Sequence, residues 1–398
     1  MNKLYVNPSG QEVTKHSYSS GETFESCPRL YEYEKVRGIR RKDKSAAMAF
    51  GRCVESSLQF YHTNNRAPGS GVDEFKRLWL GYKDNAELDY KATERDWANL
   101  YRAGSEMLRL YEIRLPDLPI VDPAWQLNYA KEVFPGTELA GLSDQGYVDI
   151  LSRAPWDHPL LPKVTAPPNS PYRPLVIDVK TAGKPLDVDP RYLALDAQLM
   201  HYAWLTGYPD TAFLWFTKSV ADAYESGTRV TLLEKSGKWT EGADLVVFRY
   251  DPETELAVVG DAGRVRELKE AINEIKGRGS TEAKTKLVDQ FLLDGLTATL
   301  DARSLTKQRL QFAAARISPE DIVEAGNRAA RQIVDIVDCS RKGVFPKRPS
   351  IRFPNRKCPM CSHRGICLGD PVLTEELLVQ ITPAAKEEDW LAELEDSE

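Results

Sequence analysis

The sequence lacks the features that would mark a membrane or secreted protein. Within its 398 residues no run of eighteen or more apolar residues occurs, and the first residues form neither a basic stretch nor an apolar signal core. We therefore expect a globular protein that does not insert in a membrane and resides in the cytoplasm. No Gly-x-x-x-x-Gly-Lys sequence followed by Ser or Thr is present, so any helicase activity must come from a partner.

Cysteine is scarce, and its placement indicates metal binding rather than disulfides. Six cysteines are too few to form a disulfide framework in a chain of this length from a reducing compartment. Cys358, Cys361 and Cys367 lie within ten residues, a spacing suited to one metal centre. A fourth thiolate is missing locally, and Cys27 can supply it if the two ends of the chain meet.

The charge is unevenly distributed. Lys and Arg number 53 and Asp and Glu 59, which gives a net charge of −6. Seven of the acids lie in residues 387–398, where no Lys or Arg occurs, so residues 1–386 carry a net charge of +1. After Cys27 comes a basic run that is either a solvated surface or a phosphate-facing patch, made of Lys35, Arg37, Arg40, Arg41, Lys42 and Lys44.

The hydrophobic pattern alternates between helical and strand periods. Helical spacing predicts helices, and alternation rich in Val, Ile, Leu and Tyr predicts strands. The helices expected are residues 45–62, 191–206 and 318–337, the last begun by the cap Ser318 and Pro319. The strands expected are residues 126–134, 146–151, 175–181, 212–218, 229–234 and 245–251. This order predicts an α/β fold in which helices flank one sheet.

One expected strand carries an acid and a base on the same face. Alternate residues of a strand share a face, so Asp178 and Lys180 project together while Ile177 points into the core. A carboxylate can hold a divalent ion, and a lysine beside it can orient the attacking water in phosphodiester hydrolysis. Alone, this spacing is more typical of a surface ion pair. Asp149 interrupts the apolar alternation of the preceding strand, and the two carboxylates can meet if the strands pair.

Two expected helices carry polar residues one turn apart. Gln198 and Tyr202 lie four residues apart on a helix that otherwise offers apolar side chains for packing. Upstream, Gly51 and Glu55 have the same spacing, and a glycine one turn before a carboxylate leaves space for an ion or a backbone.

Taken in order, these residues resemble the RecB-like branch of the PD-(D/E)XK nucleases, whose motifs are Gly-xxx-His, Gly-xx-Asp, Asp-x-Lys and Gln-xxx-Tyr. The similarity runs from about residue 17 to 217. It implies a metal site that includes Asp149, Asp178 and Val179, and a catalytic lysine, Lys180. It also implies that Gln198 and Tyr202 brace the site and contact the substrate strand.

The sequence departs from the family pattern in two places. The histidine of the first motif is replaced by Glu55, which is a competent oxygen ligand and has counterparts in related nuclease branches. His62, seven residues later, could approach the same face. The second motif is ambiguous, because Gly141 to Asp144 also fits Gly-xx-Asp; we prefer Asp149, whose neighbours alternate as in a strand, and keep Asp144 as the alternative.

The cysteine spacing resembles that of the AddB nuclease domain and of CRISPR-associated RecB-like exonucleases. In those families one early cysteine and a late trio hold a 4Fe-4S cluster, which implies the same role for Cys27, Cys358, Cys361 and Cys367. A four-thiolate zinc site remains compatible with the spacing. His363 could replace one thiolate.

The resemblance implies a restriction-endonuclease-like PD-(D/E)XK core in residues 121–260, with a mixed central sheet. Residues 1–120 would form a helical part with Cys27 and Glu55, residues 261–370 a helical part with the cysteine trio, and residues 371–398 a disordered acidic tail. The implied activity is a Mg²⁺- or Mn²⁺-dependent DNA exonuclease acting on single strands or duplex ends in recombination, repair or phage DNA processing, with a helicase or recombination protein as partner. The alternatives are a catalytically inactive nucleic-acid-binding scaffold subunit and a zinc-stabilised protein-interaction module.

Overall fold

The computed structural model describes most of the chain outside residues 219–309 and the last eighteen positions. Described are residues 2–218, 231–232, 247–251, 256–260, 274–275, 283, 297–301, 310–351 and 357–380, apart from positions 43, 84, 86–87, 91–95, 169, 185 and 187.

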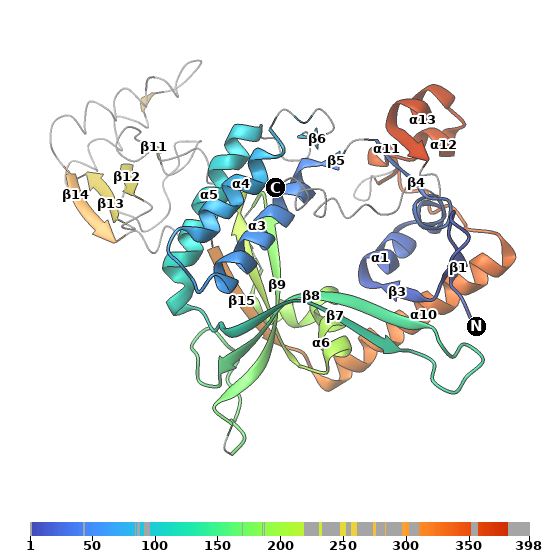
Figure 1. Cartoon of the computed structure of the whole chain (residues 1–398), viewed down its shortest axis with the longest axis horizontal. Coiled ribbons are helices and arrows are strands. Elements are labelled where there is room, and N and C mark those ends of the chain that lie inside the picture. The colour runs from blue at the N-terminus through green and yellow to red at the C-terminus, as the bar shows by residue number, and fades with distance from the viewer. Residues whose placement is uncertain are drawn as a thin grey trace.

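A six-stranded mixed sheet forms the centre of the molecule (Figure 1). Its strands run in the order β15-β10-β9-β8-β3, and β7 pairs with β8. β9 and β10 are parallel, as are β3 and β8, whereas the other pairs are antiparallel. The bounds are β3 (Lys15–Ser17), β7 (Val121–Glu132), β8 (Ser143–Pro155), β9 (Tyr172–Ala182), β10 (Asp210–Thr217) and β15 (Leu310–Arg316). The predicted mixed sheet is confirmed.

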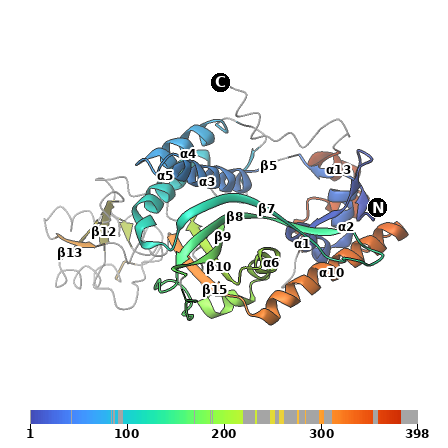
Figure 2. The same cartoon turned by 60° about the horizontal axis from the view of Figure 1, so that its bottom comes forward.

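Helices cover both faces of this sheet, as Figures 1 and 2 show. One face packs on α3 (Ala46–Thr63), α4 (Ser70–Leu80) and α5 (Trp97–Arg114), and the other on α6 (Ala197–Thr206) and α10 (Pro319–Lys342). Strand alternation divides the side chains between the layers: Ile177 and Leu214 join the α3–α5 core, whereas Val176 and Phe213 face the α6 side. The two-sided burial explains why β9 and β10 are almost continuously apolar.

α10 begins and ends as its sequence dictates. Ser318 caps the helix by accepting a hydrogen bond from the N–H of Asp321, and Pro319 occupies the first turn, as predicted. The helix ends at Gly343, whose φ of 64° is left-handed and suits glycine.

Strand β8 is the branch point of the sheet. One edge pairs with β7 between residues 143 and 153, with irregularities, while the other edge pairs with β9 at residues 150–155 and with β3 at residues 143–145. Residues 146–149 therefore have no strand partner in the described registers on that second edge. α6 packs beside this opening, and a Cβ at Gly146 would lie 2.6 Å from Leu205 Cδ1, so a glycine here lets the helix approach closely.

Segments from the two ends of the chain form one module. The early segment holds α1 (Tyr18–Ser26), α2 (Pro28–Tyr31), the π-helix η1 (Glu32–Val36) and β4 (Ile39–Arg41). The late segment holds α11 (Lys357–Met360), α12 (Arg364–Leu368), α13 (Pro371–Leu377) and β16 (Leu378–Gln380). β16 pairs antiparallel with β4, and in Figure 1 α11–α13 lie beside β4 at the upper right.

The remaining described elements are short. β1 (Tyr5–Val6) pairs with β2 (Glu12–Val13), and β5 (Lys44–Ser45) with β6 (Leu88–Asp89). Two 3-10 turns, η3 (Leu115–Asp117) and η4 (Pro190–Leu195), follow α5 and precede α6. A separate four-stranded sheet has the order β11 (Thr231–Leu232), β12 (Val247–Asp251), β13 (Leu256–Gly260) and β14 (Thr297–Asp301).

Three boundaries expected from the sequence are wrong. The strands expected at residues 229–234 and 245–251 do not extend the central sheet but belong to the separate one, as β11 and β12. The part 261–370, expected to be helical, supplies β15 to the central sheet, so the core is not confined to residues 121–260. Residues 371–380, assigned to a disordered tail, form α13 and β16, while residues 381–398 lie outside the described part of the chain.

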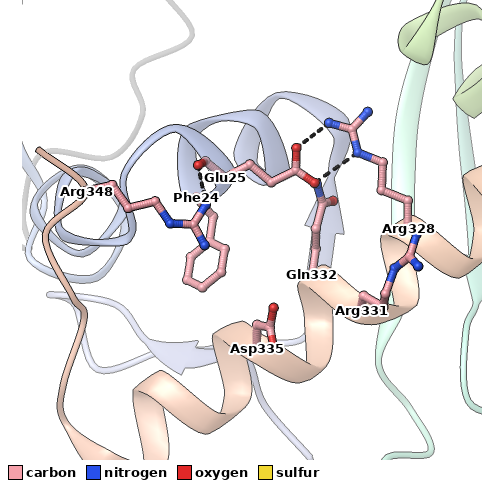
Figure 3. A pocket seen from close by; sticks show the side chains of 7 residues that line it. All are labelled: Phe24, Glu25, Arg328, Arg331, Gln332, Asp335 and Arg348. Atoms are coloured by element: carbon pink, nitrogen blue, oxygen red, sulfur yellow. Dashed lines mark hydrogen bonds and ion pairs between the residues drawn. The ribbon is translucent and has the colours of Figure 1, made fainter. Parts of the chain in front are cut away.

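A polar clasp holds α1 against α10 (Figure 3). Glu25 of α1 accepts hydrogen bonds from Arg328 and, at 2.6 Å, from Gln332 Nε2, while its backbone oxygen accepts one from Arg348. Pairing with Arg328 holds the pKa of Glu25 below its usual value. A cavity of about 460 Å³ lies between the helices and is lined by Phe24, Glu25, Arg328, Arg331, Gln332, Asp335 and Arg348. One glutamate thus links three residues that follow it by more than three hundred positions.

We expect Gly104→Ala to destabilise the helical layer. A Cβ at Gly104 of α5 would lie 2.0 Å from Cζ of Phe75, a fully buried ring that packs edge-on against Phe50 of α3. Such overpacking costs roughly 1–3 kcal/mol, which should appear as a lower midpoint of urea unfolding. Gly183→Ala is the control, because nothing lies within 4 Å of its Cβ position. Equal midpoints for the two variants would contradict this packing.

Candidate active site

Four elements bring the predicted polar residues together at the opening in β8. α3 supplies Glu55, β8 supplies Asp149, β9 supplies Asp178 and Lys180, and α6 supplies Gln198 and Tyr202. The register that pairs Ile150 with Ile177 places Asp149 and Asp178 next in line, where the two strands separate. Each element therefore contributes its polar side chain to one point.

Asp149 occupies the position at which the β8–β9 ladder ends. Its Oδ2 accepts a hydrogen bond from the backbone N–H of Val179 at 2.8 Å, so a side chain replaces the missing strand partner. The bond fixes the carboxyl beside the backbone that links Asp178 to Lys180. Val179 itself is half-buried and packs against the α3–α5 core.

Asp178 is the most enclosed carboxyl of the site, with 2% of its surface exposed. Its Oδ1 accepts hydrogen bonds from Gln198 Nε2 at 3.0 Å and from the Tyr202 hydroxyl at 3.3 Å, and Gln198 also donates to Tyr202. Its Oδ2 lies 2.5 Å from Lys180 Nζ. The predicted brace from α6 is thus present in the geometry, and one oxygen of Asp178 faces the lysine.

Glu55 reaches the site from the opposite face of the sheet opening. Its carboxyl lies within hydrogen-bonding range of Asp149 and accepts a hydrogen bond from the side-chain amide of Gln126. One turn earlier, a Cβ at Gly51 would lie 3.3 Å from Thr181 Oγ1, so glycine lets α3 pack closely against β9. The space expected beside Gly51 is therefore filled by β9 itself.

Sequence reasoning missed Gln126. It lies on β7 beside Asp149, and its φ of 51° is left-handed, which is unusual for a non-glycine residue within a strand. The β7–β8 register skips this residue, and the amide turns toward Glu55. Only the pairing of β7 with β8 reveals this neighbour, because no local pattern distinguishes Gln126 from other strand glutamines.

Burial and mutual repulsion raise the pKa of each carboxyl. The pKa of Asp178 rises to about 7, mainly through burial, although the Lys180 ammonium opposes the rise. The pKa of Asp149 also rises to about 7 through burial and the nearby charge of Glu55. Burial and the charge of Asp178 raise the pKa of Glu55. Three acids held this way carry an electrostatic cost that a cation would relieve.

The two alternative residues lie elsewhere. Asp144 is fully buried and pairs with His16 at 3.0 Å and with His201 at 3.5 Å. Burial lowers the pKa of His201 to about 4, so this α6 histidine is neutral beside Asp144. His62 bonds the Tyr111 hydroxyl at 2.8 Å, and burial lowers its pKa to about 4. The geometry therefore favours Asp149 over Asp144 and gives His62 a structural partner.

The donor chemistry of the site suits a hard divalent ion. Glu55, Asp149 and Asp178 offer only carboxylate oxygens, the ligands that Mg²⁺ and Mn²⁺ prefer. As placed, no three Cys, His, Asp or Glu side chains in the described ranges surround a common point closely enough to bind an ion. The carboxyls instead accept hydrogen bonds from neighbouring groups, and the charge of one carboxyl helps to raise the pKa of the next.

The four predicted cysteines all lie in the module formed by the chain ends, but within the described residues no three of them surround a common point. The pKa of the Cys361 thiol is raised first by burial and also by the nearby sulfurs of Cys367, Cys27 and Cys358, while the His363 N–H opposes the rise. Cys358 Sγ accepts a hydrogen bond from the backbone N–H of Ser350 at 3.2 Å. Four thiols with backbone N–H donors fit a tetrathiolate centre in donor type.

His363 does not take the place of a thiolate. It is buried, with its Nε2 3.0 Å from the backbone oxygen of Ile39, and its ring stacks on Tyr33. These contacts fasten the late helices to β4.

Comparison with known proteins gives one family match. Residues 15–139 match the family described as the PD-(D/E)XK nuclease superfamily, a span that contains Glu55 and ends before Asp149. No curated protein matches the sequence. A solved structure described as "Crystal structure of SSO0001" is 13% identical over 52% of this chain and 64% of that chain, with a TM-score of 0.21, so this chain spans less than two thirds of that protein. Among the described helices none is long and apolar enough to cross a bilayer.

We expect the metal-free protein to lose stability as the pH rises from about 4 to about 7. A carboxyl with a raised pKa binds its proton more tightly in the folded state than in the unfolded state, so ionisation between those values favours unfolding. Asp149→Asn should therefore raise the melting temperature at pH 8 in the presence of chelator, and hardly change it at pH 4. Glu138→Gln, an exposed acid on the β7–β8 turn, is the control. A melting-temperature gain in Asp149→Asn that does not depend on pH would contradict the assignment.

Proposed function

We propose that this chain is a metal-dependent nuclease of the PD-(D/E)XK superfamily that hydrolyses DNA phosphodiester bonds. The observation that carries the proposal is the convergence of Glu55, Asp149, Asp178 and Lys180 at the opening of β8. The superfamily match supports it independently, because the matched span, residues 15–139, ends before Asp149, Asp178 and Lys180. Three acids and one lysine held together with raised carboxyl pKa values are typical of a functional site rather than of a packed core.

Glu55, Asp149 and Asp178 would hold the ion, and Mg²⁺ or Mn²⁺ bound there would supply positive charge to the phosphate. The chain itself supplies the positioning. Gln198 and Tyr202 fix one oxygen of Asp178, and Gln126 fixes Glu55. The backbone N–H of Val179 fixes Asp149. Each carboxyl is thus oriented by a hydrogen bond on its outer side.

Lys180 is placed to act on the water and on the phosphate. Its side chain is 33% exposed, so the ammonium lies at the boundary between the buried acids and solvent. There it can donate hydrogen bonds to an attacking water and offset the negative charge that develops on the phosphoryl oxygens. Removing the ion pair would also leave Asp178 buried without its cation.

The finer assignment follows the sequence motifs. The Asp-x-Lys and Gln-xxx-Tyr spacings favour the RecB-like branch, and with it DNA over RNA and exonuclease action on single strands or duplex ends. Such an enzyme would act in recombination, repair or phage DNA processing beside a helicase or recombination protein. The replacement of the family histidine by Glu55 makes the ligand set all-oxygen and favours Mg²⁺ as well as Mn²⁺.

For the cysteines we propose a 4Fe-4S cluster with a structural role. Cys27, Cys358, Cys361 and Cys367 join segments more than three hundred residues apart, and a shared centre would tie these segments together. The order of one early cysteine and a late trio favours iron over zinc.

Lys180→Met and Asp178→Asn should each lower DNA hydrolysis by roughly 10²-fold or more, because each removes a group that faces the reacting phosphate. Initial rates on end-labelled linear DNA and on circular DNA, with Mg²⁺ or Mn²⁺, measure this and separate exonuclease from endonuclease action. Lys131→Met is the matched control, since that lysine contacts Trp204 rather than the acids.

Wild-type rates in either variant would refute the site. Wild-type protein that binds DNA but cleaves it with neither metal would favour the catalytically inactive scaffold subunit.

Protein purified without oxygen should be brown and contain iron and acid-labile sulfide in stoichiometric amounts, because cysteine-ligated iron absorbs visible light. Cys361→Ser should lose this absorption and melt at a lower temperature, whereas Cys53→Ser, a buried thiol in the α3–α5 core, should keep the absorption. Stoichiometric zinc without iron in the same preparation would replace the cluster by a zinc site.

A further inference from the structure

The module at the joined chain ends is strongly basic, although the chain as a whole is acidic. We define it as residues 28–42, 341–350 and 357–380, which contain twelve Lys and Arg and five Asp and Glu. Backbone and side-chain contacts join the three segments into one unit. β16 pairs with β4, and Lys347 Nζ donates a hydrogen bond to the backbone oxygen of Cys367 at 3.1 Å. The backbone N–H of Arg29 donates a hydrogen bond to the backbone oxygen of Pro346 at 3.2 Å. Arg41 and Lys342 pair with Asp89 and Asp338 outside these bounds, and the remaining excess of cations on one body creates a positive local field.

The chain leaves this module directly beside its cations. In the β16–β4 ladder Gln380 lies opposite Ile39 and Leu378 opposite Arg41, and the N–H of Lys42 donates to the backbone oxygen of Leu377. Arg40, Arg41 and Lys42 are all exposed here. Glu387 follows Gln380 by seven positions, which allows a span of at most about 25 Å.

Residues 387–398, the acidic segment, are complementary to the module in charge. They carry seven acids and no Lys or Arg, against an excess of seven basic residues in the module. Tethering so close to the module holds the acidic segment at an effective concentration in the millimolar range. The residues outside the module and the acidic segment are net negative, so like charges would repel the acidic segment from them.

The complementarity extends to apolar side chains. Met360, Leu368 and Val372 of α11, α12 and α13 are 83%, 74% and 73% exposed, which is unusual for large apolar residues on neighbouring short helices. The acidic segment contains three large apolar residues of its own, Trp390, Leu391 and Leu394. At spacings of one and three they would share one face if the segment were helical.

We propose that residues 387–398 dock on the module, with their acids against Arg40, Arg41 and Lys42 and their apolar residues on α11–α13. There the acidic segment occupies a surface suited to nucleic-acid phosphates and competes with them. The competition rests on the proposed nuclease function, whereas the docking does not. Because the contact is electrostatic and exposed, salt weakens it.

Photo-crosslinking tests the docking without any nucleic acid. Full-length protein with p-benzoylphenylalanine in place of Trp390 is irradiated, and the crosslinked peptides are mapped. We expect crosslinks within one chain to residues 28–42 or 357–380, and their loss at about 0.5 M salt. The same photoreactive residue at exposed Tyr192 is the control. Crosslinks that map to other regions, or only between chains, would overturn the docking.

Affinity tests the competition without catalysis. A full-length variant with all seven acids of residues 387–398 changed to amides is compared with wild type for binding of a labelled single-stranded oligonucleotide in chelator. At about 0.05 M salt the variant should bind about fivefold or more tightly, and at about 0.5 M salt the two should converge. As a control matched in net charge, seven exposed acids outside the module are changed to amides together: Glu12, Asp73, Asp117, Asp122, Glu138, Asp157 and Glu320.

The outcomes separate this proposal from the nuclease assignment. Equal affinities of wild type and the amide variant, or equal gains in the control variant, would overturn the competition. Intramolecular crosslinks to the module in a protein that binds no oligonucleotide would support the docking and count against the nuclease function instead.

Discussion

The fold depends on one constraint: three carboxyl groups must be held close together beside one ammonium, with Asp178 fully buried and Lys180 at the solvent boundary. This is unfavourable unless each charge is oriented by a partner. The separation of β8 from β9 after Ile150 and Ile177 provides the place, since it opens the sheet where Asp149 and Asp178 face each other. α6 and α3 then close the opening from the two faces. The layers above and below the sheet thus serve to position polar groups between them.

Much of this site could be predicted because its signals are local. Asp178 and Lys180 share a strand face by alternation, and Gln198 and Tyr202 share a helix face by spacing, so a short window of sequence suffices for each pair. Glu55 was a more difficult prediction, because it departs from the family histidine. Gln126 was missed, because its backbone conformation and its position beside Asp149 arise only from the pairing of β7 with β8.

The errors in the fold have the same origin. β3 and β15 join the central sheet through partners far away in sequence, at Ser143 and Asp210, and nothing within a three-residue or seven-residue strand specifies such a partner. β11 and β12 were recognised as strands but assigned to the wrong sheet, since alternation predicts a strand and not its neighbour. The last helix and strand before residue 381 were hidden by the acidic composition that follows them.

The clasp between α1 and α10 has a consequence for the order in which the protein can be made. Glu25 finds Arg328, Gln332 and Arg348 only after those residues have been synthesised, more than three hundred codons later. During synthesis on the ribosome, α1 therefore stays without α10 until α10 has been made, whereas β8 and β9 can already pair as a hairpin. The module at the chain ends likewise can assemble only after nearly the whole chain has been synthesised, because β16 pairs with β4.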